Sequence, residues 1–305
     1  MAAGCGTGGN SGDVDASNGS ADAAPGTPDG GAPPGFTKLI GRTWSLTAGQ
    51  KDTYKCVRIQ IPKDMYIAGF HADSPTGTHH TVVTISQNAT KVGEYDCSAG
   101  NLDYQMLFAS GVGTDDLMFP DGVGVKVSAG SYINLNLHLF NILDKPISGE
   151  TNIYVKELPS APDAAHTAEM VFAGTFNINI PSDNTDHTAD GGCTLSADAN
   201  LIALWPHMHQ TANHQLVTLT PNGSSTPMTL LDKPYSFSEQ KNYPWNPTIA
   251  VHSGDKLWVT CTYKNNTGST EMFGDSSLDE MCFSGIYRYP ATGGNLFSCT
   301  TGNPF

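Results

Sequence analysis

The sequence has 305 residues, including 33 glycines and 19 prolines, and carries a formal net charge of −14. Its 15 lysines and arginines stand against 29 acidic residues, so it lacks the basic surface on which nucleic-acid affinity rests. It also has no run of about 18 apolar residues, the length that a membrane-spanning helix needs. We therefore expect no nucleic-acid partner and no transmembrane helix, and a membrane contact only through a lipid near the N-terminus.

The first 36 residues predict a flexible, lipoprotein-like tether. Residues 6–35 contain one large aliphatic side chain, that of Val14, and bury too little apolar surface to offset their ordering entropy. The preceding Ala-Ala-Gly-Cys resembles the cleavage site of a bacterial lipoprotein signal peptide, although Ala2 stands where such sites usually carry leucine. We predict a lipid on Cys5 and a location outside the cytoplasm, whether secreted, periplasmic or anchored at the cell surface. The alternative is a disordered tail with a chance cysteine.

Residues 37–160 are expected to form the first folded domain. Apolar side chains there alternate or run together over strand-sized lengths, and Gly, Pro, Asp and Asn separate these runs. The expected strands lie at 54–62, 66–72, 79–86, 132–140 and 151–158. The polar stretch 157–168, which contains two prolines, then reads as a linker.

Residues 161–305 continue in the same way. The expected strands lie at 170–181, 199–209, 215–221, 256–265 and 281–289. Long stretches with apolar residues three and four apart, which are typical of amphipathic helices, are hard to find. We therefore expect an all-β protein made of two tandem antiparallel β-sandwich domains with a jelly-roll-like fold.

The seven cysteines are distributed in a way that favours disulfides. Cys5 stands apart, and the other six divide into two in the first half and four in the second: Cys56 and Cys97, then Cys193, Cys261, Cys282 and Cys299. If the halves fold separately, the first has one pairing and the second has three alternatives. Even counts indicate an oxidising compartment, whereas the alternative is a set of reduced cytosolic thiols.

Histidines gather in the expected strands. His79 and His80 are adjacent, so in a regular strand their rings would point to opposite faces and would not easily share a partner. His138 lies among apolar residues and asparagines, where a lone histidine is more often a core or edge residue than a ligand. His207 and His209 are two residues apart, so both rings leave the same face of a strand and can chelate a metal.

A methionine beside a cysteine supplies a further candidate ligand. Met281 adjoins Cys282, a position that packing alone also explains, because thioether side chains fill gaps well. As a ligand, a thioether would select copper over zinc, since soft sulfur suits Cu(I). Met272 is a nearby competitor that spacing alone leaves open.

The order of these residues resembles that of a known family. A His-His pair, a strand His, a linker, a His-x-His pair and a Glu-Met-Cys run follow one another, with further matches at 52–62, 66–80, 119–141 and 276–290. This order resembles the copper type II, ascorbate-dependent monooxygenases, the family of peptidylglycine α-hydroxylating monooxygenase and dopamine β-monooxygenase. The similarity covers nearly all of residues 38–305, and the tether indicates a bacterial member.

The resemblance implies two copper ions, one in each domain. The match to the electron-transfer site consists of His79, His80 and His138. The match to the catalytic, oxygen-binding site consists of His207, His209 and Met281. Both adjacent histidines would reach one copper if the chain bends at the start of their strand, after Pro75.

The resemblance also implies the cysteine pairing and the reaction. The pairs would be Cys56 with Cys97, Cys193 with Cys299, and Cys261 with Cys282. The reaction would insert one atom of O₂ into a substrate C–H bond, with electrons from ascorbate or another one-electron reductant. This makes the chain a dicopper monooxygenase by resemblance.

The expected substrate pocket departs from the family pattern. Peptide-hydroxylating members hold the substrate carboxylate with an arginine, an asparagine and a tyrosine close to the oxygen-binding copper. The matching positions here are Trp205, Phe283 and Gly285, so no charge remains there to hold a carboxylate. We therefore expect a small-molecule or peptide-like substrate that is more apolar or aromatic than a peptidyl-glycine.

Three alternatives stay open at this point. A copper-binding or copper-delivery protein would keep both sites without oxygenating a substrate. A zinc hydrolase would use a three-histidine site, although Met281 and the lack of an obvious general base near the His-x-His pair count against it. A structural adhesion module would have neither a copper site nor a zinc site. The remaining histidines fit no ligand position and read as residues on the surface or around the sites: His71, His166, His187, His214 and His252.

Overall fold

The structure of the chain is a computed structural model that describes residues 32–302, apart from residues 89–90, 99, 102–104, 112–113 and 238. The described residues form strands β1 to β21 and one short 3₁₀ helix, Ala164–His166. The expected all-β fold with antiparallel sheets is confirmed. This part of the chain contains no helix long and apolar enough to cross a membrane. Most of the predicted tether, including Cys5, lies outside the described residues.

The N-terminal half, β1 to β10, consists of two five-stranded antiparallel sheets. The first has the order β1-β10-β3-β7, with β8 also paired to β3: β1 (Thr37–Leu46), β3 (Met65–Asp73), β7 (Leu117–Met118), β8 (Val125–Val127) and β10 (Ile147–Glu157). The second has the order β5-β2-β9-β4-β6: β2 (Thr53–Gln60), β4 (Thr78–Ser86), β5 (Gly93–Asp96), β6 (Gln105–Gly111) and β9 (Tyr132–Leu139). Apolar side chains from both sheets share one core, in which Phe70 of β3 stacks on Phe108 of β6.

The C-terminal half, β11 to β21, has two larger sheets and one strand pair. One sheet has the order β17-β14-β20-β11-β21: β11 (Glu169–Thr175), β14 (Ala199–His207), β17 (Tyr243–Val251), β20 (Cys282–Tyr289) and β21 (Cys299–Thr301). The other has the order β13-β18-β15-β16: β13 (Asp186–Thr194), β15 (Ala212–Thr220), β16 (Met228–Pro234) and β18 (Lys256–Lys264). The pair consists of β12 (Asn179–Ile180) and β19 (Glu271–Met272). Among the paired strands of the described residues, only β21 runs parallel to its neighbour, β11.

The alternation of side chains explains these sheets. In β18, Leu257, Val259, Cys261 and Tyr263 are buried while the residues between them are partly exposed. One face of this strand therefore packs into the core of the C-terminal half and the other faces outward. By contrast, β9 is buried on both faces from Ile133 to Leu139, because its sheet is covered on each side at this point.

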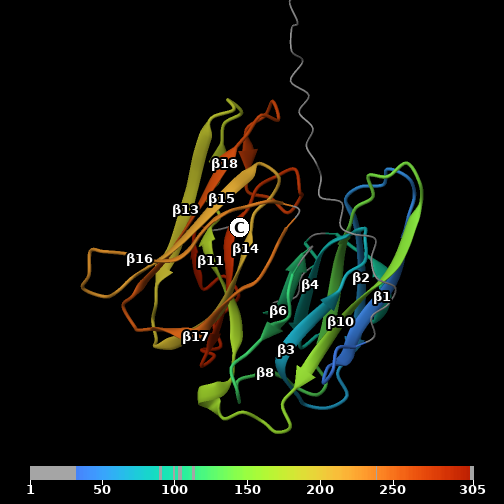
Figure 1. Ribbon diagram of the computed structural model, residues 1–305, viewed down its shortest axis with the longest axis horizontal. Coiled ribbons are helices and arrows are strands. Elements are labelled where there is room, and N and C mark those ends of the chain that lie inside the picture. Colours follow the sequence, from blue (N-terminus) through green and yellow to red (C-terminus); the bar gives the residue numbers. More distant parts are fainter. Residues whose placement is uncertain are drawn as a thin grey trace, which may run out of the picture.

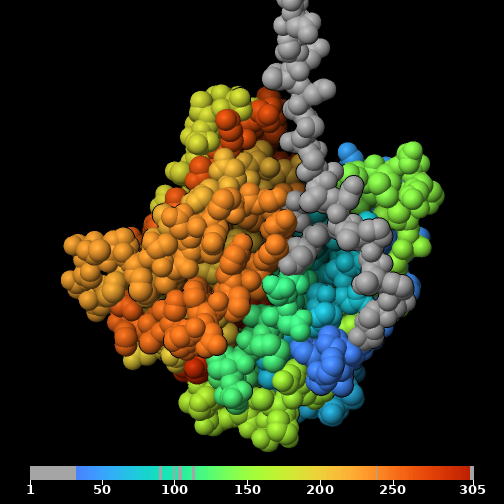
Figure 2. Space-filling model, viewed as in Figure 1, coloured from blue at the N-terminus to red at the C-terminus, as the bar shows by residue number. Residues whose placement is uncertain are grey.

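The two halves pack side by side, with the N-terminal half at the right of Figures 1 and 2. Apolar residues of β11, β14 and β20 join the N-terminal core cluster rather than that of their own half: Met170, Phe172, Trp205, Phe283 and Tyr287. All named strands nevertheless pair only within their own half. The domain boundaries at 36/37 and 160/161 stay a prediction.

Three disulfides connect the strands. Cys56 bonds Cys97, Cys193 bonds Cys299, and Cys261 bonds Cys282, which are the pairs that the resemblance implies. The last bond joins β18 to the first residue of β20, directly after Met281. Three disulfides indicate an oxidising compartment outside the cytoplasm.

Candidate metal centres

His79 and His80 follow Thr78, the first residue of β4, and His138 lies near the end of the neighbouring strand β9. Across this ladder Thr78 lies opposite Leu139 and His80 lies opposite His138, so His79 is an extra residue. Such a β-bulge interrupts the strict alternation of side chains. The structure therefore brings both rings to the side of His138, and the bend expected at the start of this strand takes the form of a bulge.

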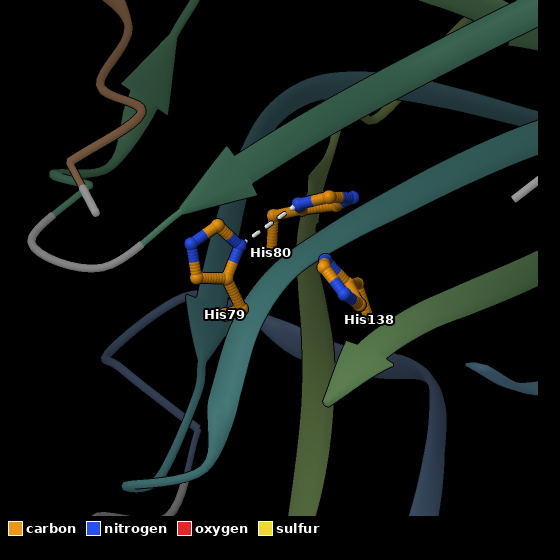
Figure 3. Close-up of side chains that lie close together, drawn as sticks. All are labelled: His79, His80 and His138. Atoms are coloured by element: carbon orange, nitrogen blue, oxygen red, sulfur yellow. Dashed lines mark hydrogen bonds between the residues drawn. The ribbon is translucent and has the colours of Figure 1, made fainter. Parts of the chain in front are cut away.

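The three imidazoles converge on a common centre (Figure 3). One ligand nitrogen from each ring lies within 4.8 Å of the other two, and the Nδ1 atoms of His79 and His80 are 3.2 Å apart. Gly77 precedes the bulge with a φ of 106°, and the indole of Trp44 occupies the space that a side chain there would need. The local backbone thus depends on glycine at this position.

The ring of His138 has one nitrogen available to bind a metal ion. Its Nε2 lies 3.0 Å from Oδ1 of Asp52, whereas its Nδ1 is buried and has no hydrogen-bond partner. A carboxylate on one ring nitrogen fixes the tautomer, so that the other nitrogen carries the free lone pair. Tyr54 stacks on the same ring with 4.5 Å between centroids. A buried nitrogen without a partner is unfavourable, and a metal ion would satisfy it, so these residues fit a copper ion.

The second group consists of His207, His209 and Met281, which all line one cavity. β14 ends at His207, so the His-x-His pair lies at the end of a strand rather than within it. The two rings are 5.3 Å apart between centroids and nearly perpendicular. Met272 does not line this cavity and is 60% exposed, so of the two methionines only Met281 lines the same cavity as the histidine pair.

Each histidine of the second group has one nitrogen occupied by a polar neighbour. Nδ1 of His207 lies 3.1 Å from Oε1 of Gln240, and Nδ1 of His209 lies 3.0 Å from the carbonyl oxygen of Asp279. If Nδ1 donates in both cases, the Nε2 lone pairs are available to a metal. Together with the thioether of Met281, this donor set also fits copper.

The buried carboxylate of Glu280 connects the segment that bears His209 to the segment that bears Met281. Glu280 is fully buried and accepts hydrogen bonds from the backbone N–H groups of His209 at 2.9 Å and Thr211 at 2.7 Å. It also accepts from the Thr211 hydroxyl and from the N–H of Met281. Burial raises the pKa of Glu280 above its ordinary value, while these hydrogen bonds oppose that shift.

Burial keeps the imidazoles of both groups neutral, three in the first group and two in the second. It lowers the pKa of His79 and His209 to about 4 and that of His207 to about 3. The pKa of His80 lies well below its ordinary value, and that of His138 is lowered also, although Asp52 opposes the shift there. At neutral pH each ring is therefore in the form that binds a metal.

The cavity between the two groups has a volume of about 100 Å³ and walls that are mainly aromatic. Trp205 and Phe283, two of the expected pocket residues, line it together with Tyr54, Phe172, Phe237, Phe273 and Phe297. Gly285 does not appear among the lining residues, because the methyl group of Met170 fills the space beside it. Trp205 and Phe283 thus belong to an aromatic cavity wall and Gly285 does not line the cavity, while the role of these residues as a substrate pocket stays a prediction.

The comparisons with known proteins support the family that the sequence resembles. The family model described as "Copper type II ascorbate-dependent monooxygenase, C-terminal domain" matches residues 164–304. The resemblance to the copper type II, ascorbate-dependent monooxygenases is thus confirmed, with the family model covering the C-terminal half. Dopamine beta-hydroxylase of Rattus norvegicus is 27% identical over a match of 204 residues that covers 61% of this chain and 32% of that protein.

Two further relatives extend the match into the N-terminal half. Dopamine beta-hydroxylase of Bos taurus is 24% identical over 81% of this chain and 45% of its own length. Tyramine beta-hydroxylase of Caenorhabditis briggsae is 22% identical over 79% of this chain and 46% of its own length. The chain therefore spans less than half the length of these relatives. Among solved structures, the major capsid protein P2 of bacteriophage PM2 aligns with a TM-score of 0.30, too low to bear on function.

The other five histidines lie outside both groups. Each has an aspartate beside it: His71 with Asp116, His166 with Asp163, His187 with Asp183, His214 with Asp232, and His252 with Asp255. Sequence reasoning gave no role to three residues that contact the candidate ligands, namely Asp52, Gln240 and Glu280. Asp52 and Glu280 stand within motifs that match the family, but their hydrogen-bond partners cannot be read from spacing. Nothing in the sequence singles out Gln240.

Proposed function

We propose that the chain is a dicopper monooxygenase. In this proposal the electron-transfer copper is held by His79, His80 and His138, and the copper at which oxygen reacts is held by His207, His209 and Met281. The observation that supports it best is the buried, unpartnered Nδ1 of His138 beside two further imidazoles. Bound copper would supply one-electron redox chemistry and the activation of O₂. One C–H bond, one O₂, two electrons and two protons would yield one hydroxyl group and one water.

The protein residues would orient the ligands and limit the access of water. Asp52, Gln240 and the Asp279 carbonyl hold the rings in fixed orientations, so that little reorganisation is needed when a metal binds. The stacked rings of Trp205 and His207, with 4.7 Å between centroids, form an apolar wall next to the second group. A largely apolar cavity would protect reactive species from water.

The substrate in this proposal is a small aromatic molecule rather than a peptidyl-glycine. Trp205 and Phe283 are buried and occupy the cavity wall where a carboxylate would need a cationic partner. The names of the relatives specify dopamine and tyramine, which are aromatic amines. A screen of aromatic substrates against glycine-extended peptides tests this point. Efficient turnover of the peptides at micromolar concentration would contradict it.

Asp275 is the residue that we propose for an amine on that substrate. Its carboxylate lines the cavity, and no ion pair to it occurs among the described residues. Burial raises its pKa, so a cation would stabilise the charged form. Asp275→Asn should raise KM for an aromatic amine about tenfold but leave an uncharged aromatic analogue unaffected. Asp116→Asn is the control, because Asp116 does not line the cavity.

Copper stoichiometry tests the central proposal. Reconstituted protein should bind two copper ions per chain, and Met281→Ala should weaken one of them as Cu(I). Met272→Ala is the matched control, because that side chain is exposed and does not line the cavity. One copper, or zinc alone, would contradict the dicopper assignment. Two coppers without reductant-dependent O₂ consumption on any substrate would instead favour the copper-binding or copper-delivery alternative.

We also propose that ascorbate or another one-electron reductant supplies the electrons and that Cys5 carries a lipid. The first part is supported by the family description and the second by the sequence around Cys5. Expression with labelled fatty acid should label the parent chain but not Cys5→Ser. An unlabelled parent chain in a host with the lipoprotein pathway would contradict the lipid.

A further inference from the structure

The residues of the second group lie at the ends of strands. β14 ends at His207, so Met208 and His209 follow it, and β20 begins directly after Met281. The ladder between β14 and β20 extends as far as the pair of His207 and Phe283. The backbone polar groups of Met208 and Met281 therefore need hydrogen-bond partners that this ladder does not supply.

The hydroxyl of Tyr235 holds both backbone polar groups of Met208. It donates to the carbonyl oxygen of Met208 at 2.6 Å and accepts from its N–H at 3.2 Å. Tyr235 directly follows β16, and its own N–H donates to the carbonyl oxygen of Asn213 on β15 at 2.8 Å. Met208 is buried in the core of the C-terminal half. Because Met208 stands between His207 and His209, this one hydroxyl fixes the backbone that bears both histidines.

The hydroxyl of Tyr263 holds the backbone of Met281. It donates to the carbonyl oxygen of Met281 at 2.8 Å, while the N–H of Met281 donates to Glu280 at 3.3 Å. Tyr263 lies in β18, which is paired on both sides, opposite His187 of β13 and Ala212 of β15. Its side chain is fully buried, so the ring cannot move without disturbing the packed core around it.

The two hydroxyls hold donor atoms of different chemistry. Tyr235 holds the segment that bears two imidazoles, which suit copper in both oxidation states. Tyr263 holds the residue that bears the thioether, and soft sulfur suits Cu(I). A less firmly held Met281 should therefore lower the affinity for Cu(I), whereas a less firmly held histidine pair should lower the affinity for Cu(I) and Cu(II) alike.

We propose that Tyr235 and Tyr263 are positioning residues of the second group, and that Tyr263 strengthens its preference for Cu(I) by fixing Met281. The inference rests on the proposed function, because it requires copper at the second group. Its support is that each hydroxyl takes the place of strand pairing next to a candidate ligand. Neither tyrosine lines the cavity between the two groups, so each acts through a ligand segment rather than on a substrate.

Copper affinities of Tyr263→Phe and Tyr235→Phe in both oxidation states test the proposal. Each substitution removes one hydroxyl and keeps the ring. Tyr263→Phe should lower the Cu(I) affinity of the second group about tenfold and leave its Cu(II) affinity unchanged. The reduction potential of that copper would then fall by about 59 mV. Tyr235→Phe should lower both affinities equally and leave the potential unchanged.

X-ray absorption of the Cu(I) protein gives a second measurement. The first group contains only imidazoles, so a copper–sulfur signal reports on the second group alone. This signal should weaken in Tyr263→Phe and persist in Tyr235→Phe. Tyr95→Phe is the matched control, because its hydroxyl donates to Oδ1 of Asn134 at 2.7 Å in the N-terminal half. Its loss should change neither the potential nor the copper–sulfur signal.

The outcomes separate this inference from the proposed function. A parent protein without copper at the second group would overturn both. If the parent binds two coppers but Tyr263→Phe keeps its potential and its copper–sulfur signal, the inference alone is wrong, even where stability falls. Unchanged affinities in Tyr235→Phe would overturn the role of Tyr235. Copper at the first group and intact disulfides identify a folded variant. If Tyr263→Phe does not fold, Tyr235→Phe decides, since its two affinities must fall together.

Discussion

Asp52 orients His138: its Oδ1 lies 3.0 Å from Nε2 of that ring and leaves Nδ1 buried without a partner. The same oxygen accepts a hydrogen bond from the hydroxyl of Ser277, 2.6 Å away in the other half of the chain. One carboxylate thus fixes a candidate ligand and contributes to the contact between the halves.

Loss of this carboxylate should weaken the first copper site. We expect Asp52→Ala to reduce copper affinity there about 10- to 100-fold, the usual effect of removing a residue that orients a metal-binding histidine. Competition titration against a Cu(I) chelator measures it. The control is Asp116→Ala, which removes a similar partner, 2.6 Å from His71, outside both groups. Equal affinities in the two variants would show that Asp52 does not orient the ligand.

Glu280 should matter for both stability and the second copper site. Glu280→Ala leaves the N–H groups of His209 and Thr211 without an acceptor in a buried place, which should cost about 3 kcal/mol in the free energy of unfolding. Thr211→Val removes a single hydroxyl donor and should cost about 1 kcal/mol. Urea unfolding measures both values. Equal losses would contradict the central role of the carboxylate.

The metal-free protein should lose stability in mild acid. In the folded chain the pKa of His209 is about 4, against an ordinary value of 6.5, so between these values only the unfolded chain binds the proton. The free energy of unfolding is therefore unaffected by this group above about pH 6.5 and falls as the pH drops toward 4. Each such histidine adds a slope of up to about 1.4 kcal/mol per pH unit.

Urea unfolding of the metal-free protein over this pH range checks the sign and the slope. His209→Gln should reduce the slope, because it removes a group whose pKa is lowered by burial. A stability that rises with acidification would contradict the buried, neutral state of the imidazoles.

The disulfide next to Met281 should stabilise the fold and position the sulfur. Cys261 and Cys282 are separated by 21 residues, so replacing both with alanine should cost about 3 kcal/mol through the entropy of the unfolded chain. Cu(I) affinity at the second site should fall as well. The matched control replaces Cys56 and Cys97, which should lower stability without changing that site. If both pairs affect the site equally, the bond does not position Met281.

The strands that were predicted and those that were missed differ in their place in the sheets. All ten expected strands exist, and most of them are interior strands, such as β9, β14 and β18. The longer strands that were not predicted are all sheet edges: β1, β6, β13, β16 and β17. An edge strand needs less apolar surface and tolerates proline, as β17 does at Pro244 and Pro247. The alternation of apolar and polar residues is therefore weak in the sequence of an edge strand.

The sequence by itself was sufficient to predict an all-β fold, because strand alternation is a local property of the chain. The order of its His, Met and Cys residues also pointed to the copper monooxygenase family. Only the tertiary structure decided how the rings of adjacent histidines come to lie near one another, since a bulge at His79 depends on the register between β4 and β9. It likewise decided that His80 and His207 are neighbours and that Gly285 does not line the cavity. These relationships arise from the packing of distant segments, which residue spacing does not encode.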